Sequence, residues 1–374
     1  MGPVDLTLPT PRLRAPSLAV RRVGCLLGLL PPLLPMLGWA LGEAAGRPAL
    51  FAWFLPLIVF GLVPLIEPLI GEDRTNAAPD EASGLEDDAW FRRVTWAVLP
   101  LQLASLLFCG WASVTAPAWL EGVGYMVSCS LVTVATAMTA GHELIHKTTR
   151  AEPLLGAALL STAWYATYKP EHLYGHHVKV GTSADNATAA RGENTYAFIA
   201  RAMRRNPRDG YALQAERLRR RGLRAWSWRN EMVWWTALSV ALSGLAFALG
   251  GLSGLAFFGG QALVAVFLLE LINYVEHYGL VRREADGRLE RIGPQHSWST
   301  GLILTNWIVF QLARHGDHHV RGARRYQVLD DREESPRLPF GYPTALLVAA
   351  VPPLWRRVMD PRLDAYDSAA NRSR

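Results

Sequence analysis

Cysteine is scarce in this sequence, with three residues among 374, and no two of them form a Cys-x-x-Cys pair. A disulfide framework or a thiolate metal site is therefore disfavoured. Charge is scarce as well, since Asp, Glu, Lys and Arg make up 19% of the chain, against about 25% in soluble domains. Hydrophobic residues make up 50%. This balance argues against an ordinary soluble enzyme, a disordered chain or a coiled coil.

The hydrophobic residues are concentrated in long stretches without any charge. Four stretches approach or exceed the roughly 20 residues with which a helix crosses a bilayer. A fifth is too long for one crossing and contains a Gly-rich place to turn at Gly250–Gly254. We therefore predict an all-α, polytopic membrane protein with about six transmembrane helices. The five stretches are Val23–Gly42, Pro48–Ile66, Val94–Leu120, Gly122–Gly141 and Met232–Leu269.

Three further apolar stretches are shorter than a full crossing and are interrupted or bounded by Pro or polar residues. We expect them to form buried or re-entrant helices. They are Pro153–Tyr168, Gly301–Ala313 and Leu338–Leu354.

Arg and Lys are concentrated outside the predicted spans, which places these segments and both termini in the cytoplasm by the positive-inside rule. The net charge of +6 then reflects membrane topology and contact with lipid, and no motif supports nucleic-acid binding. The Arg-rich stretch Arg201–Arg229 is interpreted as membrane-surface topology. Five segments follow: a cytoplasmic N-terminal segment (1–22), four transmembrane helices ending in the first histidine group (23–146), a cytoplasmic segment (147–231), two transmembrane helices (232–276) and a cytoplasmic C-terminal region (277–374).

Histidines are clustered: eight of the ten lie in three short groups. Rings four positions apart share one face of a helix, so we expect His142 with His146, and His172 with His176, to point the same way. His177 then points elsewhere and can serve a different ion. The last group is expected to bring all three rings to one side. Two metal ions explain these groups better than one, and the members are His142 and His146; His172, His176 and His177; and His315, His318 and His319.

The first group also matches the His-Glu-x-x-His pattern of zinc proteases, with Glu143 in the place of the general base. A catalytic zinc needs only three protein ligands, however, far fewer than eight. A metal transporter is a further alternative, although its polar ligands would be expected at mid-membrane. Imidazole suits several transition metals. A site at the cytoplasmic membrane face, open to an apolar substrate and to a soluble electron donor, favours a redox metal that handles oxygen.

Four segments together resemble the signature boxes of the integral-membrane alkane monooxygenases, the AlkB family within the membrane fatty acid desaturase and hydroxylase superfamily. The most specific is Asn273-Tyr-Val-Glu-His-Tyr-Gly-Leu280, because the wider superfamily shares the other boxes but not this one. It gives His277 the role of a ninth ligand. Ile145, Ala313, Gly316 and 320–322 depart from the family pattern without removing a ligand. The four segments are 142–147, 171–177, 273–280 and 312–319.

The resemblance implies a six-helix membrane fold, in the inner membrane of a bacterium, whose cytoplasmic side holds two non-haem iron ions bound by these nine histidines. It implies use of O2 to insert one oxygen atom into a terminal methyl C–H bond of an n-alkane, giving a 1-alkanol. Separate rubredoxin and rubredoxin reductase would supply electrons, because the sequence has no flavin or nicotinamide motif. Hydroxylation of the methyl groups of alkylaromatics such as xylene, and fatty-acyl desaturation, remain as alternatives.

Charged residues beside the histidines have two interpretations each. Four acidic residues adjoin a proposed ligand and are candidates to orient its ring, with solvation or a helix-end charge as the alternative. They are Glu143, Glu171, Glu276 and Asp317. Four arginines near the last box are candidates for docking an acidic electron carrier, with anchoring to phospholipid head groups as the alternative. They are Arg314, Arg321, Arg324 and Arg325.

Overall fold

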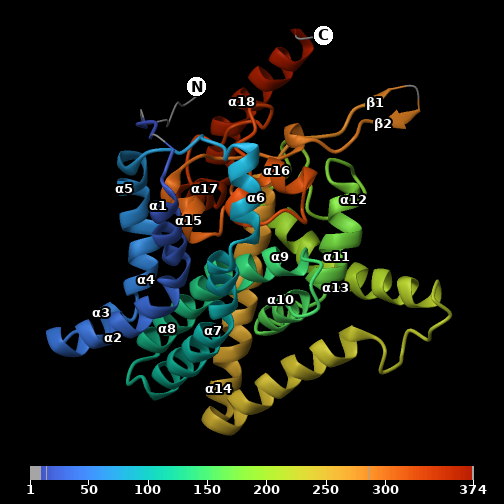
Figure 1. The fold of residues 1–374 in the computed structure, drawn as a ribbon. Helices are drawn as coiled ribbons and strands as arrows, with labels where there is room; N and C mark the ends of the chain where they lie inside the picture. Colours follow the sequence, from blue (N-terminus) through green and yellow to red (C-terminus); the bar gives the residue numbers. More distant parts are fainter. Residues whose placement is uncertain (1–9, 14, 286, 373–374) are drawn as a thin grey trace.

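The computed structural model describes residues 10–372 apart from residues 14 and 286, and helices dominate this part of the chain (Figure 1). The strands found among these residues form one short antiparallel hairpin of β1 (Glu284–Ala285) and β2 (Arg288–Leu289). The predicted helical fold is therefore confirmed. Within the predicted N-terminal segment, residues 1–9 and 14 lie outside the described residues.

Three helices are long and apolar enough to span a membrane, or four if a pair bent by 40° counts as one span. They are α7 (Ala89–Thr115), the continuous run Trp119–Ile145 and α14 (Glu231–His277). The run Trp119–Ile145 comprises α8 (Trp119–Val132), the π-helical η4 (Thr133–Met138) and α9 (Thr139–Ile145). The break between α7 and α8 contains Pro117, so the predicted span Val94–Leu120 ends earlier than expected.

The first two predicted spans are broken into short helical pieces. Proline interrupts helical hydrogen bonding, and Pro31, Pro35 and Pro48 each stand in the first turn of a new piece. Leu18–Leu29 and Pro31–Ala45 form the bent pair, and Phe54–Ile70 is a shorter apolar helix. The pieces are α1 (Leu18–Gly24), η1 (Cys25–Leu29), η2 (Pro31–Leu33), α2 (Leu34–Ala45), α3 (Pro48–Phe51), α4 (Phe54–Leu57), η3 (Ile58–Leu62) and α5 (Val63–Ile70), followed by α6 (Pro79–Asp87).

Helix α14 contains a sharp turn at Gly251, whose φ of 59° and ψ of −143° are not helical. A side chain is rarely tolerated in this conformation. A Cβ on Gly254 would also collide with the backbone oxygen of Ala246, so the two arms of α14 approach closely after the turn. The two arms diverge in Figure 1 from this point, as the Gly-rich sequence predicted.

The rest of the chain folds into shorter helices packed at one end of the long ones (Figure 1). The three short apolar stretches form helices, as expected, in α10, α15 and α17. Buried Tyr165, Tyr274, Trp298 and Trp355 belong to the largest hydrophobic cluster. The elements are α10 (Glu152–Ser161), α11 (Tyr168–Glu171), η5 (His172–His176), α12 (His177–Lys179), α13 (Thr195–Arg219), η6 (Pro294–His296), α15 (Ile303–Ile308), α16 (His315–Val320), η7 (Tyr326–Val328), α17 (Tyr342–Ala349) and α18 (Pro352–Arg372).

Gly210 of α13 determines how closely this helix packs against the segment that leads into α11. A Cβ at this position would collide with the backbone oxygen of Thr167. We expect Gly210→Ala to destabilise the protein by about 1–3 kcal/mol, the usual cost of overpacking. Gly84→Ala is the matched control, because Gly84 is also helical and has open space around it. Thermal unfolding in detergent should show a lower midpoint for Gly210→Ala alone; equal midpoints would contradict the packing argument.

Candidate metal centre

Four segments that are far apart in sequence bring nine histidines together at one end of the long helices. They are α9, the η5–α12 segment, the C-terminal end of α14 and α16 (Figure 1). The ligand atoms form two groups, and within each group all of them lie within 4.8 Å of one another. The first group is His142, His146, His172, His177 and His318, and the second is His176, His277, His315 and His319.

The second histidine box divides differently from the expectation. Residues His172–His176 form a π-helix, in which hydrogen bonds join positions five apart rather than four. His172 and His177 therefore converge, with their Nε2 atoms 3.0 Å apart. His176 turns toward the second group, where its Nε2 lies 3.2 Å from Nε2 of His319. Adjacent His176 and His177 thus face different groups, as proposed from the sequence, but His172 does not accompany His176.

The last box also divides between the groups, although its three rings lie on one side of α16 as expected, with ring centres 4.6–5.8 Å apart. His315 and His319 are four apart on α16 and their Nε2 atoms are separated by 3.0 Å. His318 instead places Nε2 at 3.1 Å from Nε2 of His177. His277 completes the second group, with Nε2 3.1 Å from Nε2 of His315.

The two groups have the properties of metal sites. Nε2 of His142 and of His146 is buried and has no hydrogen-bond partner, and such an atom costs about 1–3 kcal/mol unless something satisfies it. Burial lowers the pKa of His172, His318 and His319 well below the ordinary value. These rings are therefore neutral, which is the form that binds metals. Two nitrogens that each bind one ion at about 2.1 Å, with a right angle between the two bonds, lie about 3 Å apart. The Nε2–Nε2 distances within the two groups are close to this value.

Hydrogen bonds to the outer nitrogens orient two of the rings. Nδ1 of His176 lies 2.9 Å from a carboxylate oxygen of Asp185, and Nδ1 of His277 lies 3.2 Å from the backbone oxygen of His296. Burial opposes ionisation of Asp185, but His176 and a hydrogen bond donated by Thr188 outweigh it and lower the pKa of Asp185 to about 2. Each contact leaves Nε2 facing the group interior. The sequence analysis missed Asp185, because it lies in a polar loop outside every box.

Comparisons with known proteins agree with this geometry. Residues 117–344 match the fatty acid desaturase family. The chain is 43% identical to alkane 1-monooxygenase 2 of Pseudomonas aeruginosa over 335 residues, which cover 88% of each chain. It is 39% identical to alkane 1-monooxygenase 2 of Alcanivorax borkumensis over 341 residues, or 90% of this chain and 89% of the relative. The chain belongs to the alkane 1-monooxygenase family.

A more distant relative is the xylene/toluene monooxygenase hydroxylase component of Pseudomonas putida, which is 29% identical over 251 residues, or 66% of each chain. As a member of the alkane 1-monooxygenase family, the chain is an enzyme. Its apolar helices make it an integral membrane protein, and its histidine groups constitute a metal site.

Among the described residues, Glu276 is the one acidic candidate of the four that lies within ion-pair distance of a histidine of the two groups. Glu276 places a carboxylate oxygen 3.4 Å from Nε2 of His315 and accepts a hydrogen bond from the hydroxyl of Tyr342. Glu143 instead pairs with Lys147 at 2.9 Å and accepts a hydrogen bond from the backbone N–H of Tyr326. That arrangement removes Glu143 from the general-base position that a zinc protease would require.

The other two acidic candidates contribute to the surroundings of the site. Asp317 contacts the side chains of Arg321, Arg324 and Arg332 and accepts a hydrogen bond from the backbone N–H of Asp330. This network fixes the loop after α16. Glu171 is buried, which raises its pKa to about 8.

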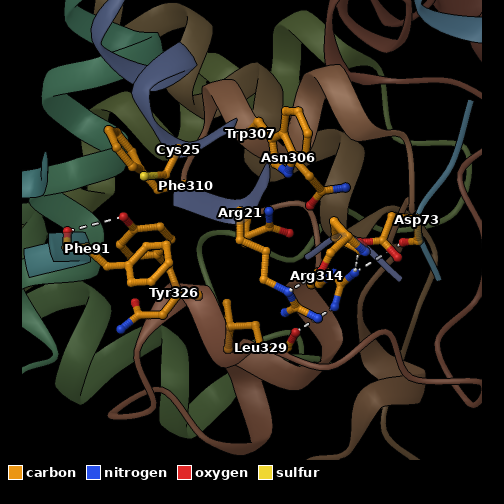
Figure 2. Close-up of a pocket in the computed structure, with 13 residues that line it drawn as sticks. Arg21, Cys25, Asp73, Phe91, Asn306, Trp307, Phe310, Arg314, Tyr326 and Leu329 are labelled. Carbon is orange, nitrogen blue, oxygen red and sulfur yellow. Dashed lines mark hydrogen bonds and ion pairs between the residues drawn. The ribbon is translucent and has the colours of Figure 1, made fainter. Parts of the chain in front are cut away.

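The four arginines suggested for docking all have partners within the protein, although Arg321 remains exposed. Figure 2 shows the Arg314 side chain directed at Asp73 and Leu329, and it donates hydrogen bonds to their backbone oxygens at 3.1 and 2.7 Å. Arg325 pairs with Glu152 at 2.8 Å. Arg321 and Arg324 both pair with Asp317 and Asp330. These contacts stabilise the segments behind the last histidine box.

An apolar cavity of about 240 Å³ lies between the short N-terminal helical pieces η1 to α5, the run Trp119–Ile145, α14, α15 and α17. Thr139, Thr305 and Tyr342 are the polar residues among those that line it. Thr139 precedes His142 by three residues of α9, or about 4.5 Å along a helix. The Tyr342 hydroxyl donates to Glu276, which contacts His315. Thr139 therefore places the cavity near the first histidine group, and the contacts from Tyr342 through Glu276 to His315 place it near the second.

Proposed function

We propose that this protein is a membrane non-haem diiron monooxygenase that inserts one oxygen atom from O2 into a terminal methyl C–H bond of an n-alkane, giving a 1-alkanol. The observation that carries the proposal is the position of two buried imidazole groups beside an apolar cavity. The relatives named alkane 1-monooxygenase support the substrate class.

The proposed ligands are the nine histidines of the two groups, each group holding one iron. Iron is supported by the family and by ligands that are all imidazole, which suit this metal. When bound, the two irons supply the activation of O2 and the oxygen transfer. Burial lowers the pKa of rings such as His172, His318 and His319 and so favours their neutral form. Asp185 orients His176, and the backbone oxygen of His296 orients His277.

The apolar cavity is proposed to bind the alkane chain. Its lining of leucine, isoleucine and valine side chains excludes water and offers no group that would hold a polar substrate along most of its length. A methyl terminus directed toward Thr139 and Tyr342 lies at the end of the cavity nearest the histidines. This arrangement favours attack at a chain end over attack in the middle of the chain.

The membrane arrangement is also a proposal. Six spans can be counted. α7 and the run Trp119–Ile145 are two, and the two arms of α14 are two more. The bent pair Leu18–Leu29 and Pro31–Ala45 is the fifth, and Phe54–Ile70 is the sixth. The positive-inside rule supports a cytoplasmic side for the histidines and both termini. We propose the segment boundaries of the sequence analysis for this topology, in a bacterial inner membrane.

Electrons must come from outside the chain, since the sequence has no flavin or nicotinamide motif and no Cys-x-x-Cys pair. We propose separate rubredoxin and rubredoxin reductase as their source.

Product analysis under ¹⁸O₂ tests the function. Cells without background activity would express the chain with rubredoxin and its reductase and would receive n-alkanes, p-xylene and a fatty acid. We expect a 1-alkanol that carries the label. A labelled benzylic alcohol would retain the oxygenase chemistry and change the substrate, and an unlabelled alkene would show a desaturase and overturn the proposal.

A further inference from the structure

A basic cleft lies beside the second histidine box, between this box, the end of α13 and the start of α14. Its volume is about 340 Å³. The charged side chains that line it are five cations and one acid: Lys147, Lys169, Arg217, Arg221, Arg229 and Glu231. The cleft is distinct from the apolar cavity, with which it shares no lining residue.

Two of these cations are neutralised by carboxylates. Lys147 pairs with Glu143 at 2.9 Å, and Lys169 pairs with Glu231 at 2.6 Å. Both lysines are buried, so these pairs form the floor of the cleft rather than a site for an added ligand.

The three arginines carry the excess positive charge. The Arg217 guanidinium lies 3.6 Å from the ring centre of Tyr174, and that of Arg229 lies 5.3 Å from the ring of Trp228. Arg217 also donates to the side-chain oxygen of Gln214 at 3.5 Å. Among the described residues, no ion pair joins Arg217, Arg221 or Arg229 to a carboxylate. The stacking on Tyr174 holds the Arg217 guanidinium in the cleft, and the N–H groups that do not contact Gln214 can bind an anion.

The position of the cleft relative to a membrane follows from the tryptophans around it. Trp226, Trp228 and Trp234 are 89%, 71% and 58% exposed, and they lie immediately before and within the first turn of α14. α14 is the most apolar of the spanning helices. Exposed tryptophan at the end of a spanning helix is typical of the membrane–water interface. The cleft therefore opens at the level of the phospholipid head groups.

We propose that this cleft binds the phosphate of an anionic phospholipid. Arginine binds phosphate oxygens in pairs through its planar guanidinium, and basic clusters at the membrane surface attract anionic lipids. Ile145, Leu173 and Leu218 add apolar walls, which suit the glycerol and upper acyl segments of a lipid and would be of no use to inorganic phosphate.

Native mass spectrometry of the full-length protein, released from detergent with equal amounts of phosphatidylglycerol and phosphatidylcholine, tests the proposal. The protein should retain phosphatidylglycerol preferentially. In Arg217→Gln/Arg221→Gln this preference should fall about 10-fold or more, because each arginine near the surface contributes appreciably to the attraction. Arg204→Gln/Arg205→Gln is the matched control, since these arginines are exposed on the same helix and do not line the cleft. Its preference should remain within about 2-fold of the parent.

Four further measurements make the result decisive. Arg217→Lys/Arg221→Lys should keep most of the preference, and bound metal should be unchanged in every variant, which excludes misfolding. Equal lipid preference in the two glutamine variants would overturn the proposal. So would binding of inorganic phosphate at the cleft without any lipid preference. Unchanged lipid retention with loss of rubredoxin-supported turnover would instead identify a protein-docking surface. The experiment measures lipid retention and not turnover, so a failure of the lipid-binding proposal is distinguishable from a failure of the proposed reaction.

Discussion

His277→Ala is expected to lose one of the two metal ions and to lower the rate of alkane hydroxylation by at least about 100-fold. His277 is one of four ligands in its group, and its Nε2 lies 3.1 Å from Nε2 of His315. Changes to residues that only support a ligand already cost about 10–100-fold, so removal of a ligand should cost more. Elemental analysis of the purified protein and turnover with rubredoxin measure the two effects.

The matched control for this prediction is His296→Asn. His296 is also buried, and its backbone oxygen contacts His277, but its ring belongs to neither group. Its ring accepts a hydrogen bond from the backbone N–H of Gly293, which the asparagine oxygen can replace. The control should keep both metal ions. Full iron content and full turnover in His277→Ala would remove this residue from the proposed ligand set.

Asp185→Asn is expected to lower turnover by about 10–100-fold and to speed metal loss to a chelator. The carboxylate of Asp185 accepts a hydrogen bond from Nδ1 of His176 and so leaves Nε2 as the ligand atom. An asparagine carries no charge and can present its amide N–H₂ to the ring, which would favour the wrong tautomer. Metal release is followed with a coloured chelator, and turnover with the same electron donors.

Asp209→Asn is the control for that experiment. Asp209 accepts a hydrogen bond from the side chain of Asn186, the residue that follows Asp185. The same substitution is therefore made in the same region, without contact to a histidine ring. Its metal release and turnover should remain within about 2-fold of the parent. Similar losses in both variants would indicate a general effect on this loop and would contradict the orienting role of Asp185.

Much of the fold was predictable because the membrane and the helix impose simple local rules. The apolar runs predicted α7, α8 and both arms of α14, and Gly250–Gly254 predicted the turn at Gly251. The first two runs were less predictable, because their prolines break them into short pieces whose packing no local rule determines.

The sequence by itself determined which residues meet at the metal centre: the spacing of eight histidines selected them, and the resemblance of the 273–280 segment to the alkane monooxygenases added His277. Only the tertiary structure decided how they divide. The π-helix at His172–His176 pairs His172 with His177, and the convergence of α16 with α14 and η5 separates His318 from His315 and His319. The structure also brought Asp185 to His176. These contacts join residues distant in sequence or depend on local helix geometry, which spacing alone does not encode.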